Sequence, residues 1–197
     1  MNQTAPKADF FSGYASRLRA VLGAADWSGV AQLAADMHEC WLAKRQVFLC
    51  GNGGSAGNAI HLANDFLYGI AKRPGGGLRV NAISANPAVI TCLANDIGYD
   101  RIFAEQLAVL GNAGDLLVVL SGSGNSANII AALEQAKVLN LKSYAILGFS
   151  GGRCKALADV PIHFQVDDMQ IAEDLQLVVG HMLMQWLHMN RPQPRYA

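Results

Sequence analysis

Residues 47–55 read Val-Phe-Leu-Cys-Gly-Asn-Gly-Gly-Ser, and residues 116–126 read Leu-Leu-Val-Val-Leu-Ser-Gly-Ser-Gly-Asn-Ser. Each stretch is an apolar run that stops in glycine and hydroxyl residues and then enters a helical pattern, which predicts a buried strand, a turn and a helix. Such a turn exposes backbone N–H groups at a helix start, where a phosphate is favoured. Neither turn contains lysine or arginine. Amides and hydroxyls would hold the anion, which suits a phosphorylated small molecule better than a nucleoside triphosphate with its metal.

The succession of apolar run, turn and helical stretch recurs from residue 46 onward. Alternating helices and apolar strands are typical of a parallel sheet covered on both faces. We therefore expect an α/β fold in three layers, with a central parallel sheet of about five strands flanked by helices. The expected strands lie at 47–50, 78–85, 116–121, 144–149 and 162–166, and the expected helices near 55–71, 87–95, 100–110, 126–139, 152–158 and 169–189.

Residues 1–45 predict two helices, with Asp26 placed to cap the second. We expect residues 1–197 to form one domain, in which residues 46–190 hold the sheet and residues 191–197 form a loose tail with two prolines. Apolar residues at helical spacing mark the faces expected to be buried. They are Val30, Leu33, Ala34, Met37 and Trp41 in the second helix, and Ile171, Leu175, Val178, Met182 and Trp186 in the last.

The chain of 197 residues is 52% hydrophobic and only 15% charged, against a typical charged share of about 25%. So little charge would leave apolar surface exposed on a monomer, which favours a homo-oligomer. The zero net charge gives no indication of nucleic acid or an anionic membrane as a partner. No leader pattern or membrane-spanning run is recognisable. We expect a cytoplasmic protein with reduced cysteines at 40, 50, 92 and 154.

Residues 51–56 also satisfy the glycine pattern of dinucleotide-binding proteins. In those proteins an acidic residue about 20 positions later, at the end of the second strand, binds the ribose hydroxyls. Here no Asp or Glu occurs between Asp65 and Asp96, so a dinucleotide site is disfavoured. A second alternative, glycines that only permit tight packing, explains one such loop better than two.

Ligands of open α/β sheets bind beyond the carboxyl ends of the strands. Both glycine/serine loops follow expected strands, so we expect them to converge on one rim of the sheet. Asn95 and Asp96 follow an apolar stretch at an expected helix end. This pair is an ordinary helix stop, and it also suits the binding of sugar hydroxyls at the same rim.

Two helices carry side chains suited to metal binding or proton transfer. His61 and Asp65 stand four residues apart, which places them on one helix face, although a polar surface pair is the simpler interpretation. Glu173 and His181 lie in the last helix, where the apolar neighbours of His181 predict its burial. Eight helical residues rise about 12 Å and turn about 80°, so these two cannot easily reach one small ion. Either Glu173 precedes the regular helix, or the two come from different subunits, which we favour.

With these motifs the chain resembles the sugar isomerase (SIS) domain family, and within it the phosphoheptose isomerase branch, from about Val47 to Leu187. The motifs are residues 51–55, His61, residues 94–99, residues 121–126 and His181. The resemblance implies isomerisation of sedoheptulose 7-phosphate to an aldose through an enediol, one zinc ion per site, and a homotetramer with sites at subunit interfaces. It also implies that the product supplies heptose for lipopolysaccharide.

The resemblance assigns roles residue by residue. Asp65 would remove the proton beside the carbonyl, and His181 would move the second proton. The zinc ligands would be His61, Asp65, Glu173 and His181. The substrate would be bound by Asn52, Gly53, Gly54, Ser55, Asp65, Asn95, Asp96, Ser121, Gly122, Ser123, Ser126 and Glu173.

Three positions depart from the family pattern: Asp65 replaces a glutamate, Glu173 a glutamine and Gly122 a threonine. The side chain of Asp65 is one methylene shorter than glutamate, so the metal or the proton-accepting oxygen would shift by about 1 Å. A displacement of that size can alter the rate of a catalysed reaction about 100-fold. Two alternatives therefore remain open: a non-catalytic SIS module that binds a sugar phosphate or a protein, and an isomerase of another ketose phosphate. The four candidate metal ligands favour an enzyme.

Overall fold

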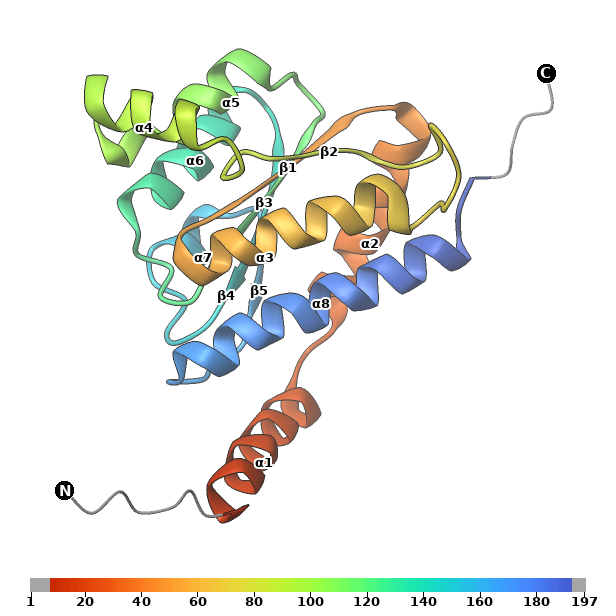
Figure 1. Cartoon of the computed structure of the whole chain (residues 1–197), viewed down its shortest axis with the longest axis vertical. Helices are drawn as coiled ribbons and strands as arrows, with labels where there is room; N and C mark the ends of the chain where they lie inside the picture. The colour runs from red at the N-terminus through yellow and green to blue at the C-terminus, as the bar shows by residue number, and fades with distance from the viewer. Residues whose placement is uncertain (1–7, 193–197) are drawn as a thin grey trace.

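The computed structural model describes residues 8–192, and its centre is one sheet of five parallel strands (Figure 1). The strands stand in the order β2-β1-β3-β4-β5. This order reverses between β1 and β3, the two strands that end in the glycine/serine loops, and ligands bind at such a reversal. The expected parallel sheet is confirmed. The bounds are β1 Gln46–Gly51, β2 Arg79–Ala82, β3 Leu116–Ser121, β4 Lys142–Leu147 and β5 Val160–His163.

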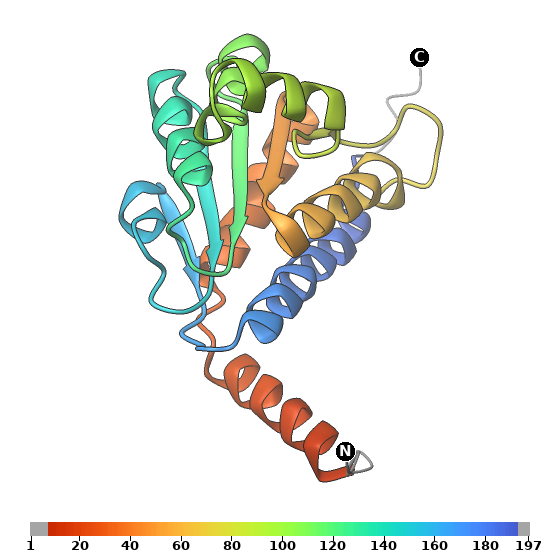
Figure 2. The ribbon, with the colours of Figure 1, turned by 60° about the vertical axis from the view of Figure 1, so that its left-hand side comes forward.

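Helices cover both faces of the sheet (Figure 2). Their bounds are α1 Ala8–Ala24, α2 Ser28–Ala43, α3 Gly53–Asn64, α4 Pro87–Asp96, α5 Ala104–Leu110, α6 Ala127–Val138, α7 Cys154–Leu157 and α8 Met169–Met189. Side chains alternate along β1, because successive strand residues point to opposite faces. Val47 and Leu49 belong to the core under α2, α3 and α8, whereas Phe48 and Cys50 belong to the core under α5, α6 and α7.

Three strands begin or end at other residues than the sequence predicts. β4 begins at Lys142 rather than at residue 144, because Lys142 pairs with Leu116 at the start of β3. β5 begins at Val160 and includes Pro161, which an edge strand tolerates. β2 is shorter than expected, because the chain turns after Ala82.

The helix expected over 55–71 changes its winding at Asp65. α3 ends at Asn64, and Asp65–Gly69 forms a π-helix in which the N–H of Ile70 bonds the carbonyl of Asp65 at 3.0 Å. Such π-turns are rare and occur frequently at functional sites.

Two further helical predictions are corrected in detail. The helix expected over 100–110 divides into a 3₁₀ turn, Tyr99–Arg101, and α5. The N-cap of α2 is Trp27 rather than Asp26, although the Asp26 carboxylate still accepts the N–H of Ser28 at 2.9 Å.

Helix α1 projects from the body of the molecule (Figure 2), and none of its 17 residues is fully buried. The Tyr14 hydroxyl donates to Asp174 at 2.5 Å, and Arg17 pairs with Asp168 at 3.1 Å. The carboxyl-terminal half of α1 still meets the body, because Tyr14, Leu18, Val21 and Leu22 are partly buried against the hydrophobic core.

Within residues 8–192, no helix combines the length and the apolar character needed to cross a bilayer. Residues 193–197 of the expected tail, and residues 1–7 of the amino-terminal region, lie outside the described residues.

Candidate active site

The two glycine/serine loops meet in one pocket at the carboxyl ends of β1 and β3, as the sequence predicts. The pocket has a volume of about 260 Å³, and neither lysine nor arginine is among the described residues that line it. The lining residues are Asn52, Gly53, Gly54, Ser55, Leu120, Ser121, Gly122, Ser123, Ser126, Met169 and Glu173.

Two helices begin at this pocket with uncapped backbone N–H groups. α3 has Asn52 at its N-cap and α6 has Ser126, and neither side chain bonds its helix. The first N–H groups of a helix have no intrahelical partner and carry the positive end of its dipole. The pocket therefore offers amides and hydroxyls to an anion.

Asn52 is held by a reciprocal pair of amide hydrogen bonds. Its Nδ2 donates to Asn128 at 2.8 Å, and Nδ2 of Asn128 donates back to Oδ1 of Asn52 at 2.8 Å. The Tyr99 hydroxyl donates to the same oxygen at 3.0 Å. Asn128 is buried, and sequence reasoning missed it because a single asparagine inside an apolar helix carries no recognisable spacing.

Ser55 is oriented from α8. Buried Gln176 donates to Oγ of Ser55 at 3.0 Å, and Asn58 donates to Oε1 of Gln176 at 2.9 Å. Because the Ser55 oxygen accepts from Gln176, its own hydrogen is available to a ligand. Gln176 was also missed, since only its position opposite the start of α3 reveals its role.

The second loop is shaped by bonds within it. Oγ of Ser121 accepts the N–H of Gly124 at 3.1 Å, and Oγ of Ser123 accepts the N–H of Asn125 at 3.3 Å. Gly124 has φ +67°, and a Cβ there would lie 2.0 Å from the carbonyl oxygen of Gly151. Only glycine fits this position.

Gly122 stands where the family pattern has threonine, and the side chain of Met169 lies against it. A Cβ at Gly122 would lie 2.5 Å from Sδ of Met169, the first residue of α8. The thioether therefore fills the space that a larger residue at this position would need.

Glu173 lies against the start of α3 rather than beside His181. A Cβ on Gly54 would lie 2.4 Å from Oε2 of Glu173, and the positive end of the helix dipole stabilises a carboxylate there. α8 is continuous from Met169 to Met189. The alternative that Glu173 precedes the regular helix is therefore wrong.

His61, Asp65 and His181 form one cluster between α3 and α8. Nε2 of His61 lies 3.0 Å from Nε2 of His181, and Oδ2 of Asp65 lies 3.5 Å from His61 and 3.7 Å from His181. The two histidine side chains are about half exposed, at 49% and 48%. The predicted burial of His181 is thus wrong. On α8 the buried positions include Val179, Leu183 and Leu187, whereas Met182 and Trp186 are exposed like His181.

The cluster has the dimensions of a metal site. Four-coordinate zinc binds N and O ligands at about 2.0–2.2 Å, which separates ligand atoms by roughly 3.3–3.6 Å. The measured separations of 3.0, 3.5 and 3.7 Å lie around that range. Two imidazoles, one carboxylate and an open fourth position are a common ligand set of catalytic zinc. Among the described residues, the group able to hold a metal comprises His61, Asp65 and His181, without Glu173.

Close packing of α3 on α8 brings the cluster together. A Cβ on Gly180 would lie 2.2 Å from Cδ2 of Leu62. Gly180 directly precedes His181, and Leu62 directly follows His61. The glycine therefore allows the two histidines to approach each other.

Asn95 and Asp96 end α4 and are not among the residues that line the pocket. Asn95 donates to Asp96 at 2.7 Å, and Sγ of Cys92 donates to Asp96 at 3.5 Å. This second hydrogen bond raises the pKa of the Cys92 thiol. From this segment Tyr99 is the residue that reaches Asn52.

The fold and the two glycine/serine loops define a SIS domain, whose family model matches residues 9–148. A phosphoheptose isomerase of Helicobacter pylori (strain P12) is 38% identical over 138 residues, 70% of this chain and 71% of that protein. One of Akkermansia muciniphila is 35% identical over 182 residues, 92% of this chain and 91% of that protein. A phosphoheptose isomerase structure from Francisella tularensis has a TM-score of 0.84 at 30% identity, covering 92% of this chain and 95% of that chain. The chain belongs to the SIS domain family and, within it, to the phosphoheptose isomerases.

Proposed function

We propose that this chain converts sedoheptulose 7-phosphate to a manno-heptose 7-phosphate by aldose–ketose isomerisation. The observation that carries the proposal is that one chain provides both parts of such a site. In support, the pocket between α3, α6 and α8 offers serine hydroxyls and helix-start amides, which suit a phosphate, and the cluster of His61, Asp65 and His181 offers imidazole and carboxylate groups, which suit proton transfer.

The phosphate would occupy the pocket and supply binding energy remote from the reacting carbons. The hydroxyls of Ser55, Ser121, Ser123 and Ser126 would donate hydrogen bonds to it, together with the amides that begin α3 and α6. Asn52, held by its partner asparagine, would bind a sugar hydroxyl at the edge of the pocket.

Asp65 would remove the proton from the carbon beside the carbonyl, and the electron pair of that C–H bond would form the enediolate. His181 would move the second proton between the two oxygens as general acid or base. Return of the first proton to the neighbouring carbon would complete the isomerisation. The separation of 3.7 Å between Asp65 and His181 allows both to act on adjacent atoms.

We propose that His61, Asp65 and His181 hold a zinc ion, with Glu173 of a second subunit as a further oxygen ligand. When bound, a divalent ion would polarise the substrate oxygens and stabilise the negative charge that develops on them.

The site proposed here lies across a subunit interface of a homotetramer. Ser55 and Asp65 are about 15 Å apart by helical rise. Seven bonds join the carbonyl carbon of the substrate to its phosphorus and span roughly 8 Å, scaled from an extended backbone. One molecule reaches both parts more easily when pocket and cluster come from different subunits.

Exposed apolar side chains support this interface, because such surfaces mark protein contacts. They lie on the elements that carry the cluster and on α1. These residues are Phe10, Phe11, Ile60, Leu67, Tyr68, Met182, Trp186 and Met189.

The remaining parts of the proposal concern organisation and setting. Residues 1–197 would form one SIS domain. The cysteines are free, which supports a reducing compartment such as the cytoplasm. There the product would enter the supply of heptose for lipopolysaccharide.

The test is to purify the protein without chelator, measure bound metal, and assay turnover of sedoheptulose 7-phosphate and several shorter ketose phosphates. We expect bound zinc, preference for the seven-carbon substrate, and loss of turnover in His181→Ala. Absence of metal and of any turnover, with sugar phosphate binding unchanged in His181→Ala, would instead support the non-catalytic module.

A further inference from the structure

The chain that follows β4 lies against the second glycine/serine loop and holds its backbone. We call residues 148–154, which end in the first residue of α7, the bracing loop. Its N–H groups donate to three acceptors in the glycine/serine loop: Gly148 to the carbonyl of Gly122 at 3.0 Å, Arg153 to Oδ1 of Asn125 at 3.1 Å, and Cys154 to the carbonyl of Gly124 at 3.0 Å. Because Gly122 lines the pocket proposed for the phosphate, the shape of that pocket depends on the bracing loop.

The bracing loop contains a residue in an unfavourable backbone conformation. Phe149 has φ +45°, in the left-handed region that residues with a Cβ rarely adopt. Its N–H donates to the carbonyl of Val166 at 2.9 Å, and its carbonyl accepts a hydrogen bond from Nε2 of His163 at 2.9 Å. These two bonds, to the last residue of β5 and to the segment after it, hold Phe149 in this conformation.

His163 is partly buried and uses both of its ring nitrogens. A carbonyl only accepts, so Nε2 carries the hydrogen that is donated to Phe149. Nδ1 lies 3.1 Å from Nζ of Lys155 in α7, and an ammonium group only donates, so Nδ1 is the acceptor. The imidazole is therefore neutral, in one tautomer, and it connects Phe149 to α7.

The bracing loop and the glycine/serine loop are in close contact, so a shift in one displaces the other. A Cβ on Gly152 would lie 2.6 Å from the carbonyl oxygen of Gly124, and glycine allows this approach. Cε2 of Phe149 lies 3.8 Å from the place of a Cβ on Gly122. The bond from His163 thus fixes a residue that itself lies against the lining of the pocket.

We infer that His163 is a positioning residue for the substrate phosphate. Through the carbonyl of Phe149 it holds the bracing loop, and through that loop it fixes the amides and hydroxyls of residues 121–126. The inference rests on the proposed function, because its effect is on phosphate binding. The phosphate is remote from the reacting carbons and is bound in substrate and transition state alike, so loss of this bond should raise KM and leave kcat nearly unchanged.

Substitutions of His163 separate its hydrogen bond from its bulk. His163→Phe keeps a ring and removes the donor, so KM for sedoheptulose 7-phosphate should rise about tenfold, with kcat within about twofold of wild type. His163→Ala also lacks the donor, introduces no new contact, and should give the same result. His163→Gln places an amide N–H near the position of Nε2, so its KM should return to within about threefold of wild type.

Inorganic phosphate gives a second readout that needs no turnover. A ligand that binds the folded protein raises its melting temperature, so phosphate should stabilise the wild type. The stabilisation should be smaller in His163→Phe and His163→Ala, and His163→Gln should recover it. A role of His163 in stability alone would lower the melting temperature without changing this response to phosphate.

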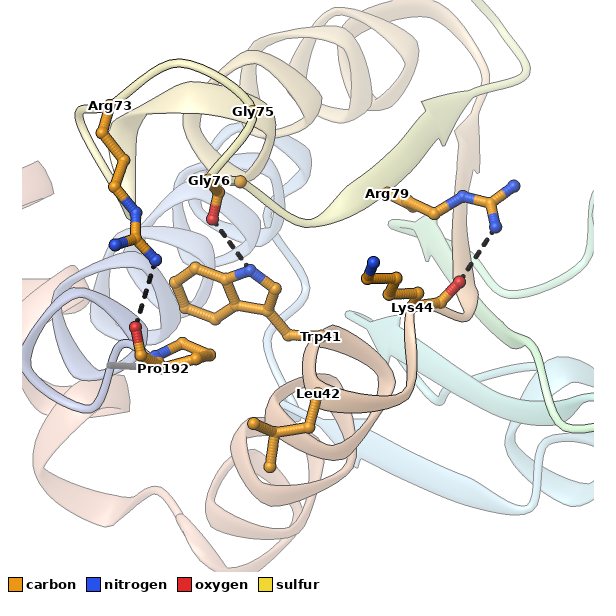
Figure 3. Close-up of a pocket in the computed structure, with 9 residues that line it drawn as sticks. Trp41, Leu42, Lys44, Arg73, Gly75, Gly76, Arg79 and Pro192 are labelled. Atoms are coloured by element: carbon orange, nitrogen blue, oxygen red, sulfur yellow. Dashed lines mark hydrogen bonds between the residues drawn. The ribbon is translucent and has the colours of Figure 1, made fainter. Parts of the chain in front are cut away.

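Trp41 provides a matched control in a cleft beside the start of β2 (Figure 3). Its Nε1 donates to the carbonyl of Gly76 at 3.0 Å, so here too the N–H of an aromatic ring holds the carbonyl of a loop. Neither residue is among those that line the phosphate pocket. Trp41→Phe removes the donor and keeps a ring. It should lower the melting temperature and leave both KM and the response to phosphate unchanged.

Three results would overturn the positioning role while turnover by the wild type keeps the proposed function. They are a wild-type KM and phosphate response in His163→Phe and His163→Ala, a rise in KM no larger than that of Trp41→Phe, and a KM of His163→Gln as high as that of His163→Phe. A wild type without turnover and without any response to phosphate would overturn the proposed function and this inference together.

Discussion

Asp65 has two proposed tasks, as metal ligand and as base. Two substitutions test separately whether these tasks need the carboxylate group and whether they need a side chain of this length. Asp65→Asn should lower kcat by about 10²–10⁴-fold, the usual contribution of a general base, and should reduce bound zinc. Asp65→Glu keeps the carboxylate and restores the family residue, so its kcat should stay within about 100-fold of wild type. Steady-state kinetics with metal analysis checks both. Turnover of Asp65→Asn close to wild type would contradict the proposed base.

Glu173 brings a negative charge into the pocket proposed for a phosphate. Its carboxylate lies against Gly54, and a like charge about 4 Å away costs about 1 kcal/mol even in a water-like medium. Glu173→Gln keeps an oxygen ligand and removes the charge, so KM for the sugar phosphate should fall about fivefold. Gln170→Glu, one turn earlier on α8, provides a control that changes charge outside the pocket. An increase in KM for Glu173→Gln would show that the carboxylate assists binding.

At the level of helices, the closeness of α3 and α8 should control activity. Gly180→Ala places a methyl group against Leu62, so it should destabilise the fold by about 1–3 kcal/mol and lower kcat by moving His181 away from His61. Adding Leu62→Val should recover part of that loss, because it removes a methylene from the contact. Gly57→Ala on α3 meets no atom within 4 Å and should keep full activity. Urea unfolding and kcat measure these effects, and additive losses in the double variant would contradict the contact.

The start of α8 should make stability depend on pH. The backbone N–H of Ile171 donates to Asp168, and with Arg17 it holds the pKa of this carboxyl below its ordinary value of 3.8. A lowered folded-state pKa adds stability above the unfolded pKa, and that stability is lost as pH falls through the folded pKa. The urea midpoint of wild type should therefore exceed that of Asp168→Asn by a constant amount above about pH 5, and the difference should shrink towards pH 3. A difference that does not change with pH would exclude this carboxylate as the cause.

The elements themselves were largely predictable, because apolar periodicity reports which residues are buried. Their ends were less so. Lys142 joins β4 only because Leu116 lies beside it, and the π-turn at Asp65 has no signal in residue spacing. On α8 the sequence offers apolar residues on more than one face, so the buried face could not be chosen from periodicity. Met182 and Trp186, which the predicted stripe includes, are exposed.

At the level of the whole molecule, the glycine/serine loops could be predicted as one pocket because parallel strands end at the same edge of a sheet. The residues that hold these loops, Asn128 and Gln176, could not, because they act through contacts between segments far apart in sequence. The separation of Glu173 from His181 was predictable from helical rise alone.

Mixed oligomers can decide how the sites are assembled. Ser123→Asp should be inactive because its charge repels the phosphate, and His181→Ala should be inactive because it removes a member of the cluster. If one subunit supplies the pocket and another the cluster, a random mixture of the two variants holds intact sites at about one quarter of positions. Turnover should then return to about that share of wild type after co-expression, with the two separately refolded proteins as the control. If pocket and cluster of the same subunit act together, every site carries one defect and no turnover returns, so the interface would be structural and the substrate would have to reach along α8.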